Sequence, residues 1–288
     1  MINTLSNYLR TYRKRSGLSQ AELGLLLGGR DRSKVSRYER TARLPNLDTV
    51  FAYEVIFGVP ARELFAGLYS EVEVRIYEQA TLLSEKLAEA PSTPDVRHKR
   101  EVVQQIISRA GLPRHEATVQ EGKAKKMRVI ALDPTTHGFG FVMLEGPSRL
   151  IDWGHSYVRA CTNEKCLKQI TELIAWYRPH VVVIEDAESK ESRRGPRVGR
   201  LLGEVARIAE DSGASIARFS PREVQRTFAP QGSITKHQIA TRVADAFQEL
   251  SHRLPPPRKY YDGEDERMSL FDAAALALTF FRSSEEAY

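Results

Sequence analysis

The chain has 288 residues, 41% of them hydrophobic, with a net charge of +6 and a pI of about 9.3. This length leaves room for one large domain or two ordinary ones, and the composition supplies a real core. No apolar run approaches the roughly 20 residues of a membrane span, and the N-terminus lacks the basic-then-apolar layout of a signal peptide. The positive charge favours a polyanionic partner.

The cysteine content is low. Cys161 and Cys166 make no disulfide framework, so a reducing cytoplasm is the predicted location. Their C-x4-C spacing raises the alternative of structural zinc. No second Cys or His pair follows at finger-like spacing, which weighs against that alternative.

Residues 1–68 are predicted to form a compact helical domain. Leu5, Leu9 and Tyr12 lie at helical spacing in a first helix. Ser19 and Glu22 make a capping box, a serine N-cap with a glutamate three residues later, at the start of a second helix. Gly, Asn, Asp and Pro residues mark where the remaining helices begin and end. They predict a second helix over 20–27 and a third over 34–40, which Asp31 or Ser33 would cap. A fourth helix is predicted after Asn46 and a short fifth around Leu64.

Residues 69–126 are predicted to be a connector. Apolar residues from Val72 to Leu87 follow a loose 3–4 spacing that predicts one helix, broken near Pro91, and too short for a confident coiled coil. A second, polar helix is expected over 95–110. The segment from Gly111 to Lys126 has the composition of a flexible linker.

From Met127 to residue 288 the pattern becomes α/β. Strands at 128–133, 138–144 and 150–158 predict an antiparallel meander, and strand 181–184 is apolar on both faces, as a central covered strand should be. Further helices and a strand at 215–219 alternate after it, ending in an Ala-rich helix over 267–281. This order is the layout of an RNase H-like fold with a mixed five-stranded sheet.

Three carboxylates, Asp133, Glu185 and Asp272, stand at the end or on the face of apolar elements. Burying such charges costs free energy unless an opposite charge neutralises them. One divalent cation could neutralise all three carboxylates together. Oxygen-only ligands favour Mg²⁺ or Mn²⁺, and a carboxylate-held metal pair is the apparatus of phosphodiester hydrolysis. The alternatives are that Asp133 caps a turn and that Glu185 pairs with an arginine. A lone carboxylate among alanines at position 272 is rare.

Two stretches in the first domain, Gly17-Leu-Ser-Gln-Ala-Glu-Leu23 and Ser33-Lys-Val-Ser-Arg-Tyr-Glu39, resemble a lambda-repressor-like (Xre-type) helix-turn-helix over residues 5–66. The resemblance implies a recognition helix in the major groove and a phosphate contact at the start of the second helix. Residues 1–68 carry +5 of the net charge, as phosphate contact requires. A protein-binding helical bundle with a solvated basic face is the alternative. The implied DNA-binding residues are Gln20, Arg32, Ser33, Ser36 and Arg37, whereas Leu23, Val35 and Tyr38 are expected in the core.

Motifs in the α/β region resemble, in family order, the RuvC family of DNA-junction nucleases. They are Ile130-Ala-Leu-Asp-Pro134 with Gly138-Phe-Gly140, Val182-Val-Ile-Glu185, Gly199-Arg-Leu-Leu-Gly203, Ser220-Pro-Arg-Glu-Val224, Gly232-Ser-Ile-Thr-Lys236 and Asp272-Ala-Ala-Ala-Leu-Ala277. The resemblance implies that Asp133, Glu185 and Asp272 bind the metals. It also implies a homodimer that cuts branched DNA. Lys236 is expected to neutralise the scissile phosphate, its alternative being a solvated helix lysine.

Three positions depart from that family. The family's fourth acidic or His ligand, one turn before the last Asp, is Ser269 here, and Asp265 or Glu266 could substitute at longer range. Gln225 replaces a family lysine. No aromatic wedge stands between Glu185 and Arg200; a basic loop takes its place, and its Arg193, Arg194 and Arg197 are expected to bind DNA. Tyrosines 260 and 261 could stack bases, against the alternative of a surface insertion.

The resulting hypothesis is an Mg²⁺- or Mn²⁺-dependent DNA endonuclease selective for branched or four-way junctions and positioned by its helix-turn-helix. The first rival is a catalytically weak or inactive RuvC-like regulator that binds DNA. The second rival, an actin-like ATPase, lacks the Gly-rich phosphate loops that it requires.

Overall fold

We describe a computed structural model for residues 5–29, 32–109, 127–157, 162–257, 263 and 265–285. The chain divides into two compact units, Met1–Lys123 and Ala124–Tyr288, which are treated separately below. In the described part of the chain, no helix is both long and apolar enough to cross a membrane.

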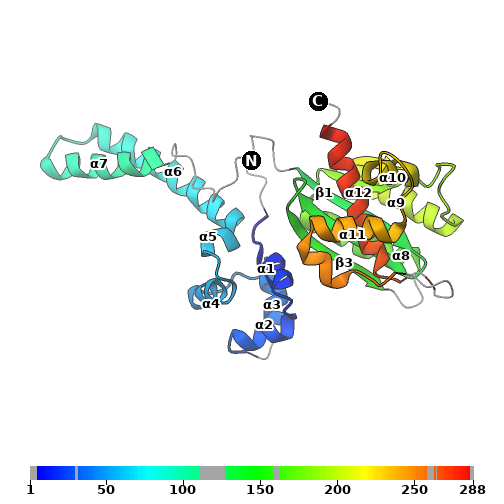
Figure 1. Ribbon diagram of the computed structural model, residues 1–288. Coiled ribbons are helices and arrows are strands. Elements are labelled where there is room, and N and C mark those ends of the chain that lie inside the picture. The colour runs from blue at the N-terminus through cyan, green and yellow to red at the C-terminus, as the bar shows by residue number, and fades with distance from the viewer. Residues whose placement is uncertain are drawn as a thin grey trace. The chain divides into compact units, whose positions relative to one another are not determined.

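The first unit begins with five short helices (Figure 1), which are α1 (Leu9–Arg15), α2 (Gln20–Leu26), α3 (Arg32–Glu39), α4 (Leu47–Phe57) and α5 (Ala61–Leu64). The predicted capping box is confirmed, because Ser19 accepts from the backbone N–H of Glu22 and Glu22 accepts from that of Ser19. The prediction for Leu5 was wrong, since α1 begins four residues later. Asp31, one of two predicted caps of α3, lies outside the described residues.

The predicted core of this domain is confirmed. Leu23, Val35 and Tyr38 are buried in one cluster with residues of α1, α4 and α5. Residues of four other helices therefore share one core with the inner side of α3, which leaves its outer side to solvent. That division of the helix is what a recognition helix requires.

Two long helices follow, α6 (Ala66–Glu89) and α7 (Pro94–Arg109), close to their predicted positions. They form an antiparallel hairpin at the far end of the unit in Figure 1. Arg100 donates to the carbonyls of Leu87, Ala88 and Ala90, and so satisfies the end of α6. The linker predicted at 111–126 lies outside the described residues.

The second unit contains a mixed five-stranded sheet in the order β3-β2-β1-β4-β5 (Figure 1). The strands are β1 (Arg128–Thr135), β2 (Gly138–Glu145), β3 (Leu150–Tyr157), β4 (Val181–Glu185) and β5 (Ser215–Phe219). Strands β1, β2 and β3 form the predicted antiparallel meander, whereas β4 and β5 run parallel to β1. The fold class is confirmed: a helix-turn-helix region precedes an RNase H-like α/β domain.

Helices cover this sheet, and α12 (Met268–Glu285) contacts all five strands. The others are α8 (Asn163–Tyr177), α9 (Pro196–Asp211), α10 (Pro221–Phe228) and α11 (Lys236–Ala246). One prediction was wrong, because the helix expected over 235–250 ends at Ala246. There Phe247 takes an extended conformation with its side chain buried, and a 3-10 helix, η1 (Gln248–Arg253), replaces the last turn.

Candidate active site

Side-chain alternation brings two predicted carboxylates to one face of the sheet. Val129 and Ala131 of β1 lie in the core cluster that contains α12, as do Val181 and Val183 of β4. Because successive strand residues point to opposite faces, Asp133 and Glu185 continue the same two rows. Leu132 pairs with Ile184 in the parallel register, so both carboxylates stand at the carboxyl ends of adjacent strands.

Asp272 reaches this face from α12 because a glycine lets the helix approach. Gly140 of β2 pairs with Asp133, and a Cβ at position 140 would meet the carbonyl carbon and oxygen of Ser269 at 2.2 Å. Only a residue without a side chain allows this contact between strand and helix. The first turn of α12 is thereby held over the strand that carries Asp133.

Lys236 is the first residue of α11, behind a capping box formed by Thr235 and Gln238. Its Nζ lies 3.2 Å from Oδ2 of Asp272, and more than half of the lysine side chain is exposed. The structure therefore brings together all four residues predicted to be catalytic. Lys236 is a solvated helix lysine, the alternative that the sequence offered, and it also pairs with Asp272.

Arg194 occupies the space between the first two carboxylates. Its Nη2 contacts Oδ1 of Asp133 and lies 2.6 Å from Oε2 of Glu185, and its Nε donates to the same Glu185 oxygen at 2.8 Å. Its Nη1 donates to the carbonyl of Pro134 at 2.8 Å, and Ser192 donates to the other oxygen of Glu185. The pairing of Glu185 with an arginine, an alternative in the sequence, is what the structure contains.

The charges of this cluster act on one another strongly. Burial raises the pKa of Asp133 to about 7, against an ordinary value of 3.8; Arg194 opposes that shift, while Asp272 reinforces it. Burial alone would lower the pKa of Arg194, but Asp133 and Glu185 overcome this effect and raise it. Arg194 is therefore cationic at every accessible pH.

The donor set fits a hard divalent cation in its chemistry, since all three side chains offer only carboxylate oxygens. As arranged here, Asp133 and Glu185 are turned to a guanidinium. Among the described residues, no group of three or more His, Cys, Asp or Glu side chains is placed to hold a metal ion. The arrangement places positive charge where the sequence predicts a metal, and the protein supplies that charge itself.

The three arginines expected to bind DNA after β4, Arg193 and Arg194 of the β4–α9 loop and Arg197 at the start of α9, have different environments. Arg193 is exposed, Arg194 lies in the carboxylate cluster, and Arg197 donates to the carbonyl of Thr136 and to Asn163. Sequence reasoning did not foresee the roles of Arg194 and Ser192. The sequence did contain one signal for the pairing of Arg194 with Glu185. The arginine follows the strand-end glutamate by nine residues, in a loop that contains Gly and Ser.

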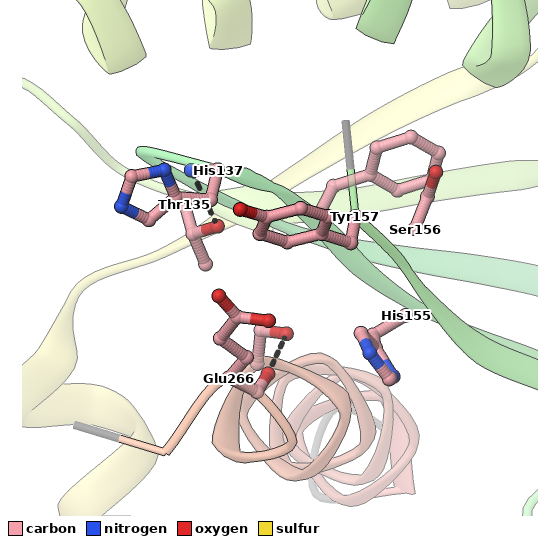
Figure 2. A pocket seen from close by; sticks show the side chains of 8 residues that line it. Thr135, His137, His155, Ser156, Tyr157 and Glu266 are labelled. Carbon is pink, nitrogen blue, oxygen red and sulfur yellow. Dashed lines mark hydrogen bonds between the residues drawn. The ribbon is translucent and has the colours of Figure 1, made fainter. Parts of the chain in front are cut away.

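The position of the family's fourth ligand opens onto a small surface pocket lined by Ser269, Glu266, Thr135 and His137, among others. Figure 2 shows the Glu266 carboxylate pointing from the start of α12 toward the β1–β2 hairpin. Asp265 instead pairs with Arg267 at 2.6 Å, which lowers the pKa of Asp265. Asp265 is thus engaged by Arg267, whereas Glu266 lines the pocket beside Ser269. Tyrosines 260 and 261 and Cys161 lie outside the described residues, and Cys166 is buried.

Residues expected to read DNA lie on α2 and α3. Arg32, Ser33 and Arg37 are exposed on α3, where the Arg37 guanidinium donates to Ser33, and Ser36 is half-buried. The Gln20 side chain donates to Glu39 at 2.8 Å. Four of the five residues thus belong to the outer side of α3, while Gln20 is engaged inside its own domain.

Known proteins are similar to each of the two domains of this chain. A helix-turn-helix domain family model matches residues 4–66. A crossover junction endodeoxyribonuclease RuvC from Akkermansia muciniphila is 27% identical over 168 residues, covering 55% of this chain and 93% of that protein. Its counterpart from Chlorobium phaeovibrioides is 27% identical over 128 residues, covering 41% and 68%.

The solved structures that resemble this chain include Thermus thermophilus RuvC, at 25% identity and a TM-score of 0.42, with 56% of this chain and 97% of that chain covered. The same protein in complex with a Holliday junction substrate gives 20% identity and a TM-score of 0.41, with 55% and 96% covered. The chain thus joins a helix-turn-helix domain to an α/β domain with the sheet order β3-β2-β1-β4-β5 that is similar in sequence to RuvC.

Proposed function

We propose that this protein is an Mg²⁺- or Mn²⁺-dependent DNA endonuclease. The observation that carries the proposal is the convergence of Asp133, Glu185 and Asp272 on one face of the sheet, next to Lys236. The relatives named crossover junction endodeoxyribonucleases support the same reaction. A structural cluster alone would not require a lysine at its solvent edge.

Each side chain has a definite task in this proposal. Asp133 and Glu185 would hold the metals from two adjacent strands, and Asp272 would complete the set from α12. Divalent metals, when bound, supply activation of water and stabilisation of the leaving oxygen. Lys236 would neutralise the scissile phosphate, because its ammonium lies at the open edge of the site and is more than half exposed.

DNA would be bound by the outer side of α3. Arg32, Ser33 and Arg37 are exposed there, on a domain that carries most of the net charge. Phosphate contacts by such residues supply affinity and salt dependence. Gln20 would need to leave Glu39 to meet a phosphate, so we assign it a smaller part.

Branched DNA is the proposed substrate. The relatives' name is the support for it, and the basic loop between Glu185 and α9 supplies exposed cations near the active site. In that loop Arg193 is exposed to solvent, whereas Arg197, in the first turn of α9, is anchored to Asn163 and to the carbonyl of Thr136. Arg193 is therefore the loop residue that we expect to contact the DNA backbone first. Cytoplasmic location remains a prediction of the cysteine content.

A homodimer is proposed on the basis of two apolar surfaces in the first unit. Leu47, Phe51 and Val55 follow one another at four-residue spacing on α4 and are 67%, 55% and 83% exposed. Side chains four apart lie on one helix face, so they make a continuous apolar stripe. A dimeric helix-turn-helix protein reads two DNA half-sites. The stripe on α4 would then pack against a second copy of the chain.

The α6–α7 hairpin carries the second surface, a groove lined by Leu83, Leu87, Val102 and Ile106. The two helices differ in charge: α6 carries five acidic and two basic residues, and α7 carries four basic and two acidic ones. A two-fold axis would set each α6 against the partner's α7, with complementary charge. Light scattering should give a dimer for the wild type; monomers for both Val55→Glu and Val102→Glu would support both surfaces, and a wild-type monomer would refute the dimer.

A catalytically inactive DNA-binding regulator is the second candidate. The observation that favours it is the occupation of Asp133 and Glu185 by Arg194, which lets the cluster exist without metal. In this case the RuvC-like domain would bind DNA without cutting it. The two candidates differ in whether metal enters the site.

Cleavage of labelled four-way junction, flap and duplex DNA with Mg²⁺ or Mn²⁺ tests the choice. The nuclease proposal predicts metal-dependent cutting of the junction and a loss of at least about 10³-fold in Asp133→Asn and Asp272→Asn, as expected when a metal ligand is removed. Equal cutting by the variants would show a contaminant and sink the proposal. A preference for linear duplex would remove only the junction part.

The role of the first domain is tested by deletion. Removing residues 1–68 should weaken duplex binding and flatten its dependence on salt, because the phosphate contacts are lost. Arg37→Gln should do the same to a smaller degree, with the exposed Arg62 of α5 as a matched control. Unchanged binding by the deletion would refute DNA binding through this domain.

A further inference from the structure

We propose that Arg194 is an exchangeable internal cation that competes with divalent metal for Asp133 and Glu185. The site would hold either the guanidinium or the metal, and metal entry would require the β4–α9 loop to withdraw. This inference rests on the proposed function for the identity of the metal ligands. It adds a residue that controls their access.

The first support is the geometry of the contact. All three side-chain nitrogens of Arg194 donate to the two carboxylates or to the carbonyl of Pro134. One of them, Nη2, contacts both predicted ligands. A guanidinium that bridges two carboxylates covers the oxygens that a cation would need. The competition is therefore direct and involves the same atoms.

The second support is the charge of the cluster. Three carboxylates face Arg194 and Lys236, so the cluster is close to balance without metal. Adding a divalent ion while Arg194 remains would place two cations side by side in a partly buried site, where charges interact strongly. Arg194 is the cation that must leave, since it is the one in direct contact with both Asp133 and Glu185.

The third support is the loop itself. Residues 186–195 connect β4 to α9, and none of them is buried. Beyond hydrogen bonds within the loop, the backbone N–H of Asp186 donates to the carbonyl of Phe219 in β5. Ser192 binds Glu185, and Arg194 binds Glu185, Asp133 and the carbonyl of Pro134. A segment without buried apolar contacts opens at low free-energy cost. Withdrawal would add Arg194 to the exposed cations of the basic loop.

Mn²⁺ binding to the full-length protein, followed by the electron paramagnetic resonance of free Mn²⁺, tests this proposal without relying on activity. Arg194→Gln should bind Mn²⁺ at least about tenfold more tightly than the wild type, a difference of roughly 1.4 kcal/mol. Arg194→Lys should fall between them, because lysine keeps the charge but cannot bridge two carboxylates as arginine does. Arg197→Gln is the matched control, since Arg197 contacts Thr136 and Asn163 instead.

Two results would overturn the proposal. One is an Mn²⁺ affinity of Arg194→Gln that equals or falls below that of the wild type. The other is a gain in affinity that persists in the double variant Asp133→Asn/Arg194→Gln, because that metal would lie elsewhere. A tighter-binding Arg194→Gln with no cleavage of any DNA would sustain the competition while refuting the nuclease, so the two failures are distinguishable.

Discussion

Each unit of this protein contains an arginine in a buried ion pair, Arg13 with one carboxylate and Arg194 with two, and the two arginines differ in what holds them. Arg13 of α1 binds Glu39 of α3 inside a helical core, with side chains 11% and 1% exposed, and also donates to the carbonyl of Leu18. Arg194 binds Asp133 and Glu185 from a loop without a buried residue. We call Arg13–Glu39 the locked pair, because the packed core holds both residues in place. We call Arg194 with Asp133 and Glu185 the releasable pair, because the arginine is on a loop.

The difference shows that the surroundings of a buried ion pair decide its role. Arg13 and Glu39 join two helices whose apolar sides are already packed together, so separating the charges would mean opening the domain. Arg194 can leave without disturbing the sheet, because the strand ends that carry Asp133 and Glu185 are fixed by their own register. A buried ion pair indicates function more strongly when one partner is on a loop.

The largest effect is expected from breaking the locked pair. Glu39→Ala leaves Arg13 buried without its partner, and this should lower the free energy of unfolding by about 3–5 kcal/mol. Chemical denaturation of the full chain, followed by circular dichroism, measures it. Mn²⁺ should not restore the lost stability of Glu39→Ala. Recovery of stability on adding Mn²⁺ would contradict the proposed difference between the two ion pairs.

A smaller loss is expected where α12 meets the sheet. Gly140→Ala places a methyl group against the backbone of Ser269, so α12 must shift away from β2, at a cost of about 1–3 kcal/mol. Because Asp272 moves with the helix, Mn²⁺ binding should weaken as well. Gly203→Ala on α9, where a Cβ meets nothing within 4 Å, is the control; similar melting of both variants would show that the close approach is not required.

The releasable pair should cost less to break. Arg194→Gln should lower stability by about 1 kcal/mol in the absence of metal, because the raised pKa of Asp133 lets that carboxyl take up a proton once the arginine is gone. Saturating Mn²⁺ should recover this loss, since a ligand that binds only the folded state stabilises it. Thermal unfolding with and without Mn²⁺ gives both values, and an equal metal shift in variant and wild type would contradict the account.

The last effect concerns the pH dependence of stability. Burial raises the pKa of Asp133 to about 7, so the folded state binds a proton that the unfolded state releases near pH 4. The stability from this proton is present below about pH 4 and is lost as the pH rises toward 7. The metal-free wild type should lose stability over that range relative to Asp133→Asn; parallel profiles for the two proteins would contradict the shift.

Much of the fold was predictable from local rules. Capping residues Ser19 and Asn46 mark helix starts that the structure confirms, and Gly58, at a positive φ of 63°, ends α4 as expected. Strand β5 has its predicted bounds. These signals succeed because they depend on neighbours in the chain. The break at Phe247 was not predictable in this way, since burial of its ring depends on distant elements of the core.

The candidate site was predictable only in part. Asp133, Glu185 and Asp272 could be found because a carboxylate after an apolar run needs compensation, and Lys236 because of its place in a motif. Arg194 was assigned to DNA instead, since a basic loop gives no sign of the direction its arginines take. That direction depends on Pro134 and Glu185, which belong to strands 60 and nine residues away in sequence.

The central claim is that metal and Arg194 exchange at Asp133 and Glu185, and a crystal of the full chain grown with Mn²⁺ tests it most directly. Anomalous scattering locates Mn²⁺ regardless of activity. The account predicts a peak within ligand distance of Asp133 and Glu185, with the Arg194 side chain withdrawn from both. Saturating Mn²⁺ with no peak at these carboxylates, and with Arg194 still bridging them, would contradict it.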